Sequence, residues 1–383
     1  MWPDFIIFGS GNYNSLGVLH ALADAGKDAL VLCIGKSRDR KHGNIIGHSR
    51  FSKYLLEVSD VEEGVRWLIE NKSKFPEGTI IYPTGDIEEM ALDKESENLK
   101  SHYVFPSCSE SGEVSRLMEK SSQIEQAERH GLRIIRSQYS NSPDFSFEKV
   151  EYPCMAKPLN STVGTKGDMR ICQNENDLKE ALLNGKHTKN FIIQKYINNE
   201  ADLLFLGVAL PDGDVVIPAL VKKPGVSPTG EYSHAIITTE IDKHLPEKEK
   251  VISFVKSLGY TGPFSIEFGL ENGKNYFFEI NLRNDGTSHY PLNAGVNIPM
   301  IYFNSIRGLT QKSTWRPTEY EMIDEVADLR RVLNRHLSLS AWIKSFRKAG
   351  SYKFYYRKDK RLLLQIVPMF LNRSFSKFIR TLS

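Results

Sequence analysis

Four polar residues on two short alternating segments have the types and spacing of a metal site. Glu267 lies in the first segment, and Glu279, Asn281 and Arg283 lie in the second. Polar residues occupy one parity and apolar residues the other, which predicts two strands with one polar face each. Carboxylate and amide oxygens, with phosphate and water, are ligands that Mg²⁺ prefers. By residue type alone, a metal site and a solvated strand face are equal alternatives.

A turn signal lies between the two segments. Asn272-Gly273 favours a type I′ turn, because both central residues of such a turn need positive φ. The segments should therefore form one antiparallel hairpin with the acids on a single face. The opposite, apolar face should carry the other parity, which comprises Phe264, Ile266, Phe268, Leu270, Tyr276, Phe278, Ile280 and Leu282.

Two lysines and a flexible loop upstream could bind phosphate groups. Lys120 falls on a helical pattern over 114–131, and Lys157 ends a short strand. The small polar residues of 159–167 follow directly, without the spacing of a Walker A loop. Such a loop can still fold over phosphates through its N–H and hydroxyl groups. A plain hairpin loop is the alternative.

The N-terminal third predicts a parallel sheet that would support these residues. Strand patterns at 5–8, 29–34, 54–58 and 80–82 alternate with helical patterns, as in βαβ units. Gly9-Ser10-Gly11 follows the first strand, but the third glycine and the terminal acid of a dinucleotide site are missing. We interpret it as a Rossmann-like turn. Asp86, after the fourth strand, either faces a cleft or caps a helix.

Taken in chain order, these features resemble the ATP-grasp superfamily. Within it, the chain is most similar to the carboxylate–amine ligases of the carbamoyl-phosphate-synthase-like and D-aspartate-ligase-like group. The resemblance rests on the two lysines, the 161–167 loop, Gln194-Lys195-Tyr196-Ile197, Glu267 and Glu279-Ile280-Asn281-Leu282-Arg283. It implies mixed α/β and α+β architecture, with a Rossmann-like domain over 1–110 and an ATP-grasp fold over 111–310. Two α+β subdomains, 111–198 with the lid and 199–310 with the metal, would grip ATP.

The resemblance also implies a role for each residue. Lys120 and Lys157 would contact the phosphates of ATP, and Glu200 or Asp202 would hold the ribose. Arg283 and Lys157 would act in catalysis. The lid would cover the phosphates with Ser161, Thr162, Val163 and Gly164, and the hinge that pairs with the adenine through its backbone would be Gln194, Lys195, Tyr196 and Ile197. Two Mg²⁺ (or Mn²⁺) ions would be bound by Glu267, Glu279 and Asn281.

The implied activity is ATP-dependent joining of a carboxylate to an amine, often an amino acid, in cell-envelope or surface-glycan synthesis. The alternatives are a synthetase that only phosphorylates a small molecule and a non-catalytic nucleotide-binding module. His234 and His289 are the candidate proton carriers, each more often a bystander at such positions. No signature identifies either substrate, for which 222–234 and 284–289 would supply pockets.

Composition is that of an ordinary globular protein, with 40% hydrophobic and 25% charged residues. The four dispersed cysteines and the absence of a signal-peptide pattern predict a cytoplasmic enzyme. The net charge is +3, yet 341–383 carries +10 and the remainder about −7. This basic, aromatic end of a 311–383 region predicts either a packed subdomain or a peripheral membrane contact. We expect the substrates to be small molecules and expect no nucleic-acid partner. A homodimer is one assembly that the chain could form.

Overall fold

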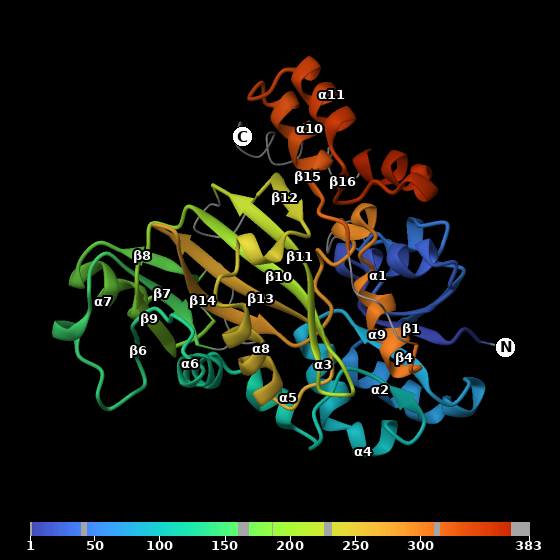
Figure 1. Ribbon diagram of the computed structural model, residues 1–383, viewed down its shortest axis with the longest axis horizontal. Coiled ribbons are helices and arrows are strands. Elements are labelled where there is room, and N and C mark those ends of the chain that lie inside the picture. Colours follow the sequence, from blue (N-terminus) through green and yellow to red (C-terminus); the bar gives the residue numbers. More distant parts are fainter. Residues whose placement is uncertain are drawn as a thin grey trace.

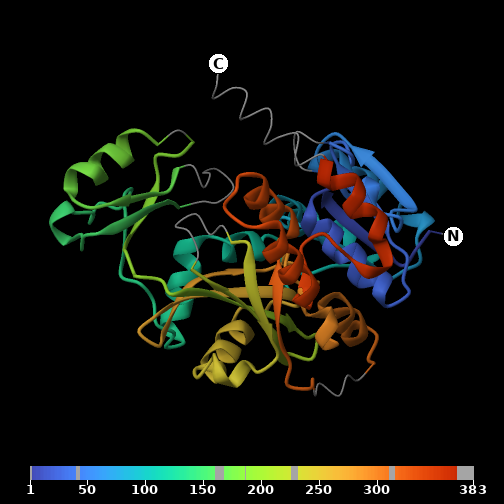
Figure 2. The ribbon, with the colours of Figure 1, turned by 90° about the horizontal axis from the view of Figure 1, so that it is seen from above.

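The computed structural model describes residues 2–39, 44–159, 168–185, 187–225, 232–309 and 315–368. Three sheets follow one another along the chain (Figure 1). Seen from above, the small green sheet of the second unit stands apart from the blue N-terminal unit, and the large sheet lies between and below them (Figure 2). The mixed α/β and α+β architecture expected from the sequence is confirmed.

The N-terminal sheet is entirely parallel, with the strand order β3-β2-β1-β4-β5. Its buried strands are short apolar runs, as a sheet covered on both faces requires. The strands are β1 (Phe5–Ser10), β2 (Leu30–Ile34), β3 (Tyr54–Val58), β4 (Thr79–Pro83) and β5 (Tyr103–Val104). The helices are α1 (Tyr13–Asp24), α2 (Val61–Glu70), α3 (Asp86–Lys94) and α4 (Ser96–Leu99).

A four-stranded antiparallel sheet of order β6-β9-β7-β8 forms the second unit. Its strands are β6 (Ser137–Tyr139), β7 (Cys154–Pro158), β8 (Arg170–Cys172) and β9 (Phe191–Lys195). Helix α7 (Glu175–Leu183) packs on the face that carries Cys154, Ala156 and Ile193. The opposite face therefore carries Lys157 and Gln194. Helices α5 (Glu113–Leu117) and α6 (Lys120–Arg129) connect this sheet to the first one.

The third sheet has seven strands in the order β14-β13-β10-β11-β12-β15-β16. The strands are β10 (Ala201–Ala209), β11 (Val215–Pro224), β12 (His234–Thr238), β13 (Gly262–Glu271), β14 (Lys274–Asn281), β15 (Glu319–Ile323) and β16 (Ser351–Tyr352). Helix α8 (Lys248–Ser257) packs on one face, and α9 (Ile298–Ile306) packs on the other with the N-terminal unit. Two strands from beyond residue 310 thus belong to this sheet.

The predicted hairpin is present, but its alternation is broken in the second strand. Glu267 pairs with Glu279, whereas Phe268 pairs with Phe277, so β14 contains one extra residue at this point. The bulge buries Phe277 in the core, while Phe278 lies partly exposed on the face of Glu267. The predicted positions of Tyr276 and Phe278 on the apolar face are therefore wrong, because the extra residue shifts the parity.

The C-terminal region contains two helices separated by a short break. It forms α10 (Glu325–Leu333) and α11 (Leu339–Lys348). The break is local, because Arg335 has φ of 61° and the Ser338 side chain caps the N-terminus of α11. A helix over 360–368 packs Leu362 and Ile366 against Leu16 and Ile45 of the N-terminal unit.

Candidate active site

The two glutamates of the hairpin lie directly opposite each other. Glu267 on β13 pairs with Glu279 on β14, and paired residues of an antiparallel ladder share a face. Asn281 pairs with Ser265 and donates its Nδ2–H to Ser265 Oγ at 3.4 Å. Two carboxylates and an amide thus line one strip of the sheet, as the sequence predicted.

A lysine that the sequence did not indicate accompanies Glu267. Lys223 Nζ lies 3.1 Å from Glu267 Oε1, and both side chains are largely buried. Burial raises the pKa of Glu267, Lys223 opposes this rise, and Asp202 and Glu279 add to it. Strand β11 extends to Pro224 and carries Lys223 opposite Asp202.

Both predicted phosphate-binding lysines converge on the same acids from other elements. Lys120, the first residue of α6, places Nζ 3.9 Å from Glu279 Oε2. Lys157, on β7, places Nζ 5.0 Å from the centre of the Phe278 ring. Burial lowers the pKa of Lys157, and the nearby Lys120 lowers it further. The arrangement concentrates positive charge beside the two carboxylates, where a bound polyanion would be neutralised.

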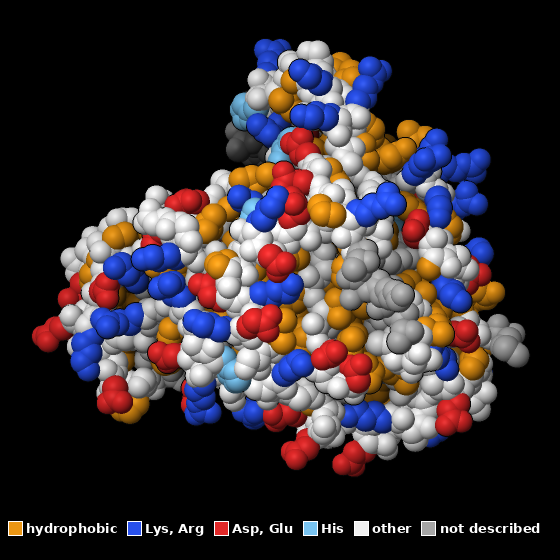
Figure 3. All heavy atoms as spheres, in the orientation of Figure 1, with side chains coloured by type: hydrophobic (Ala, Val, Ile, Leu, Met, Phe, Trp, Pro, Cys, Tyr) orange, Lys and Arg blue, Asp and Glu red, His pale blue; other side chains and the backbone are white. Residues whose placement is uncertain are grey.

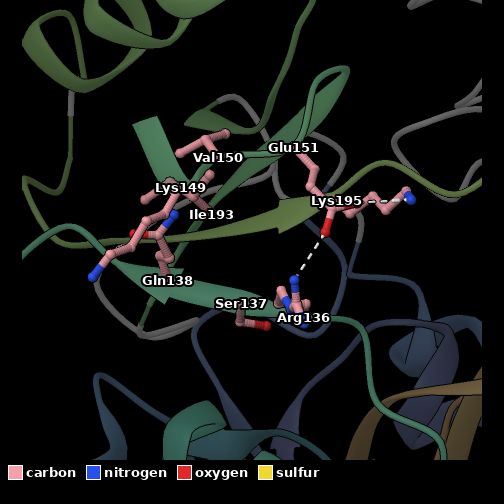
Figure 4. A pocket seen from close by; sticks show the side chains of 8 residues that line it. All are labelled: Arg136, Ser137, Gln138, Lys149, Val150, Glu151, Ile193 and Lys195. Carbon is pink, nitrogen blue, oxygen red and sulfur yellow. Dashed lines mark hydrogen bonds and ion pairs between the residues drawn. The ribbon is translucent and has the colours of Figure 1, made fainter. Parts of the chain in front are cut away.

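The first two hinge residues, at the end of β9, place their side chains on opposite faces of the small sheet. Gln194 is buried and donates Nε2–H to Ser137 Oγ at 3.0 Å. Lys195 points away from the acids and pairs with Glu151 Oε2 at 2.8 Å, in a shallow pocket with Arg136 (Figure 4). The contribution of Lys195 to an adenine site would therefore come from its backbone.

The backbone of this hinge contains one open donor between paired neighbours. Tyr196 donates its N–H to Pro153 O at 2.9 Å, and Asn198 donates its N–H to Glu271 Oε1 at 2.6 Å. Within the described ranges, the N–H of Ile197 has no protein acceptor. A strand end with a free donor beside the Phe278 ring can receive a planar base.

The two candidate ribose ligands differ sharply in their surroundings. Glu200 is exposed, and its Oε1 accepts the N–H of Asn272 at 2.7 Å, which fastens the hairpin turn. Asp202 is buried on β10 and accepts Nδ2–H of Asn199 at 2.5 Å. Asp202 also lies in the electrostatic neighbourhood of Lys157, Lys223 and Glu267. Asp202 is thus the one of the pair that lies with the other site residues.

Arg283 joins the hairpin to the N-terminal sheet. Its Nε donates to Asp86 Oδ1 at 2.5 Å, and its Nη2 donates to Asn281 Oδ1 at 3.5 Å. Burial lowers the pKa of Arg283, but Asp86 and then Asp285 raise it, and the pKa lies above its ordinary value. Asp86 begins α3 without capping it by its side chain. Asp86 therefore faces the junction of the hairpin with the N-terminal unit.

Asn14 and Asn284 form a second link at the same junction. Asn284 donates Nδ2–H to Asn14 Oδ1 at 3.2 Å, and Asn14 donates Nδ2–H to Thr84 O at 2.6 Å. Glu88, two residues after Asp86, is buried close by, and burial raises its pKa. Sequence reasoning missed Asn14 and Glu88. The two residues lie shortly after strands β1 and β4, at the carboxyl edge of a parallel sheet. This position is where α/β sheets place ligands, and it could have identified them from the sequence.

Neither candidate histidine is set up as a proton carrier for this site. His289 is buried against Gly17, and burial lowers its pKa to about 3. His234 lies between Glu321 Oε1 at 2.6 Å and Asp328 Oδ2 at 2.8 Å, away from the hairpin. Both histidines serve the packing of the fold.

The predicted metal ligands fit a divalent cation in type. Glu267 and Glu279 repel one another, and a cation between them would relieve that repulsion. Two acids and an amide would leave positions for phosphate oxygens and water. Among the described residues, no group of three or more His, Cys, Asp or Glu could hold a metal by itself. The lid residues Ser161, Thr162, Val163 and Gly164 lie outside the described residues.

Comparison with known proteins gives a family and partial sequence relatives. Residues 126–297 match the family model of the ATP-grasp domain. The large chain of carbamoyl phosphate synthase from Sulfolobus acidocaldarius is 31% identical over 147 residues, which are 36% of this chain and 13% of that protein. The same protein from Sulfurisphaera tokodaii is 30% identical over 142 residues, 35% and 13% of the two chains. The chain thus spans a small part of these relatives' length.

Solved structures share the fold over most of the chain. N5-carboxyaminoimidazole synthetase from Staphylococcus aureus aligns with a TM-score of 0.66 at 16% identity, over 87% of this chain and 86% of that one. L-amino acid ligase from Bacillus licheniformis aligns with a TM-score of 0.63 at 14% identity, over 83% and 78%. These matches show that residues 126–297 form an ATP-grasp domain and that the chain shares the fold of these solved structures.

Proposed function

We propose that this protein is an ATP-dependent carbon–nitrogen ligase that activates a carboxylate as an acyl phosphate and joins it to an amine. The observation that carries the proposal is the convergence of Lys120 and Lys157 on the paired carboxylates Glu267 and Glu279. Cations beside acids, on one strip of a sheet, suit a nucleotide polyphosphate bound through a divalent metal. ATP and Mg²⁺ (or Mn²⁺) are accordingly the proposed cosubstrate and metal.

Each part of the site has a proposed task. Lys120 and Lys157 hold phosphate oxygens, the Ile197 N–H and the Phe278 ring receive the adenine, and Asp202 holds the ribose. Mg²⁺ bound by Glu267, Glu279 and Asn281 would neutralise charge on the transferred phosphoryl group. Lys223 opposes the rise in the pKa of Glu267 that burial causes, because an opposite charge at 3.1 Å favours the carboxylate.

The proposed chemistry has two steps. The γ-phosphoryl group passes from ATP to a carboxylate oxygen, which yields ADP and an acyl phosphate. An amine then attacks the acyl carbon, loses a proton and expels phosphate, which yields the amide. Arg283 lies between the metal strip and the N-terminal unit, so its guanidinium can stabilise the oxyanion that forms during the attack. Asp86 holds that guanidinium in place.

The substrates should bind where Arg283 meets the N-terminal sheet. Similar folds include a ligase of L-amino acids and a synthetase of N5-carboxyaminoimidazole. An amino acid as one substrate, small molecules throughout and a role in cell-envelope or surface-glycan synthesis are parts of this proposal. The four cysteines are free thiols, which suits a reducing compartment such as the cytoplasm. A homodimer is the proposed assembly.

A second candidate is a synthetase that stops at a phosphorylated small molecule. The similarity to the large chain of carbamoyl phosphate synthase, 31% identity over 147 residues, favours this candidate. Dependence on an amine separates the two, since only the ligase needs an acceptor.

The test is the release of ADP and phosphate with a matrix of carboxylates and amines. We expect turnover that needs both substrates, and we expect Glu279→Gln to lower kcat by about a thousandfold or more through loss of a metal ligand. Glu97→Gln, an exposed carboxylate on α4, is the matched control and should leave kcat unchanged. Normal turnover in Glu279→Gln would reject the site. ADP release without an amine would favour the second candidate.

A further inference from the structure

The C-terminal elements present an outer surface with charge of one sign. Residues 325–368 contain eleven Lys and Arg and three acids. All three acids are buried, at 1% exposure for Glu325, 0% for Asp328 and 1% for Asp359. Backbone N–H groups of 353–355 bind Glu325, and His20 and Ser49 bind Asp359. The three acids thus bind groups inside the protein, and the charge that remains exposed in these elements is positive. Blue side chains gather over α10 and α11 accordingly (Figure 3).

Large apolar side chains are exposed within the same elements. Four of the nine exposed large hydrophobic side chains in the described part of the chain lie in 325–368. They include Leu333 at 51%, Leu339 at 55% and Ile343 at 37% exposure. Single exposed leucines are common on protein surfaces, but several of them amid lysines on one short helix pair are not. We name Leu333, Leu339, Ile343, Lys344, Arg347 and Lys348 the α11 patch.

The sequence of α11 explains how the patch arises. At about 100° per residue, Trp342 and Phe346 share an apolar stripe with Leu339 and Ile343. Trp342 and Phe346 turn inward, where Phe346 packs on Tyr352 with ring centres 4.8 Å apart. Leu339 and Ile343 form the uncovered edge of that stripe. Next to this edge lie Lys344, Arg347 and Lys348, which have no acidic partner among the described residues. The helix therefore buries aromatic side chains on its inner side and exposes both aliphatic and basic side chains on its outer side.

We propose that the α11 patch docks on the surface of an anionic lipid bilayer. Basic side chains would contact the headgroup phosphates, and Leu339 and Ile343 would enter the boundary with the acyl chains, as amphipathic interfacial helices do. Exposed aliphatic side chains favour lipid over nucleic acid. Binding of single strands would need exposed aromatic rings for stacking, but the aromatic rings of α11 pack against the protein. No helix in the described ranges has the length and apolar character needed to cross a bilayer.

The docking surface is separate from the nucleotide site. The patch lies on α10 and α11, whereas the acids and lysines of the site lie on β7, α6, β13 and β14 (Figure 1). Membrane binding can therefore be measured without reference to catalysis. An enzyme held at a bilayer would meet a lipid-linked substrate at high local concentration. This consequence rests on the proposed ligase function, whereas the proposed membrane binding does not.

The test is co-sedimentation of the full chain with vesicles of phosphatidylcholine alone or with roughly a quarter phosphatidylglycerol. We expect binding only to the anionic vesicles. The double variant Leu339→Ser with Ile343→Ser should weaken it about tenfold or more, and Lys344→Glu with Lys348→Glu should abolish it. The matched controls are Leu183→Ser, on an apolar side chain exposed by 75%, and Lys72→Glu with Lys74→Glu. These should bind like the parent chain.

Three outcomes would overturn the proposal. They are no binding to anionic vesicles, equal losses in the α11 and control variants, and retained vesicle binding in both α11 variants. Tighter capture of a DNA or RNA oligonucleotide than of vesicles, lost in the lysine variant, would assign the patch to nucleic acid instead. Thermal unfolding and ADP release in solution show that each variant is folded, and neither should change.

Discussion

At the scale of single residues, the site is a balance of charges that no one segment provides. Glu267 is buried beside Glu279 and Asp202, which disfavours its charged form. Lys223, on β11 at 3.1 Å, opposes this effect. Burial lowers the pKa of Lys223, but Glu267, together with Tyr232, Asp285 and Asp202, raises it above its ordinary value. An opposite charge of this kind favours the carboxylate, which is the form that can bind a cation.

The choice between the two ribose candidates gives a prediction at this scale. We expect Asp202→Asn to raise the KM for ATP about tenfold or more, because a charge-assisted hydrogen bond to a hydroxyl would be lost. Glu200→Gln should change it less than about twofold, since Glu200 is exposed and already binds Asn272 N–H. Steady-state kinetics with varied ATP decides. The reverse ranking would give the ribose to Glu200.

At the scale of elements, the bulge in β14 decides which side chain faces the proposed nucleotide site. Phe278 is the residue inserted opposite the Glu267–Phe268 step, and its ring lies over Gly269 on β13. A Cβ at Gly269 would lie 2.2 Å from Phe278 Cζ and 2.9 Å from Ile197 Cδ1. Glycine is therefore required here by close approach of a ring. The bulge, the glycine and the ring form one unit beside the hinge.

This unit yields a prediction for Gly269→Val. The new side chain would displace the Phe278 ring and the Ile197 side chain, so we expect the KM for ATP to rise about tenfold or more while the protein remains folded. The control is Gly207→Ala on β10, where a Cβ would lie 2.3 Å from Phe264 Cζ in the core. It should lower the melting temperature and leave the KM unchanged. An unaltered KM in Gly269→Val would contradict the assigned base pocket.

At the scale of the whole molecule, the region after residue 310 completes the large sheet and contacts the N-terminal unit. β15 pairs with β12, and β16 pairs with β15, so the seven-stranded sheet is complete only with this region. Asp359 binds His20 Nε2 at 3.3 Å and Ser49 Oγ at 2.5 Å in the N-terminal unit. Among the described aromatic residues of this region, Phe354 is buried, and Phe346 packs on Tyr352 and Tyr355. Phe370, Phe375 and Phe378 lie outside the described residues.

His234 ties this region to the sheet and makes the stability dependent on pH. Hydrogen bonds to Asp328, and then Glu321, raise the pKa of His234 to about 9 although burial opposes the rise. Because the folded pKa exceeds the unfolded value of about 6.5, the stabilisation is complete below pH of about 6.5 and is lost as the pH rises toward about 9. After allowance for solvent screening, it amounts to about 1–2 kcal/mol.

The prediction is a free energy difference that depends on pH. Urea unfolding of the parent chain and His234→Gln should differ by about 1–2 kcal/mol at a pH of about 6, and the difference should shrink at a pH of about 9. His336→Gln, at an exposed histidine without an acidic partner in the described residues, is the control and should show no such trend. A difference for His234→Gln that is constant with pH would refute the assignment.

The sequence by itself determined the local geometry of this protein. Alternation and Asn272-Gly273 predicted the hairpin, and they placed Glu267 and Glu279 on one face of it. The apolar runs of the N-terminal third predicted the parallel sheet in the same way. These features depend on neighbours within a few positions, where turn chemistry and side-chain period act directly.

The tertiary structure decided everything that depends on distant pairing. Lys223 reaches Glu267 across two strand pairings, Asp86 reaches Arg283 from the start of α3 in the N-terminal unit, and Asp202, unlike Glu200, lies among the other site residues. The bulge reversed the faces of Tyr276 and Phe278, because one extra residue shifts a period of two. Strand register and the docking of sheets are set by the whole core, and no local pattern of residue types encodes them.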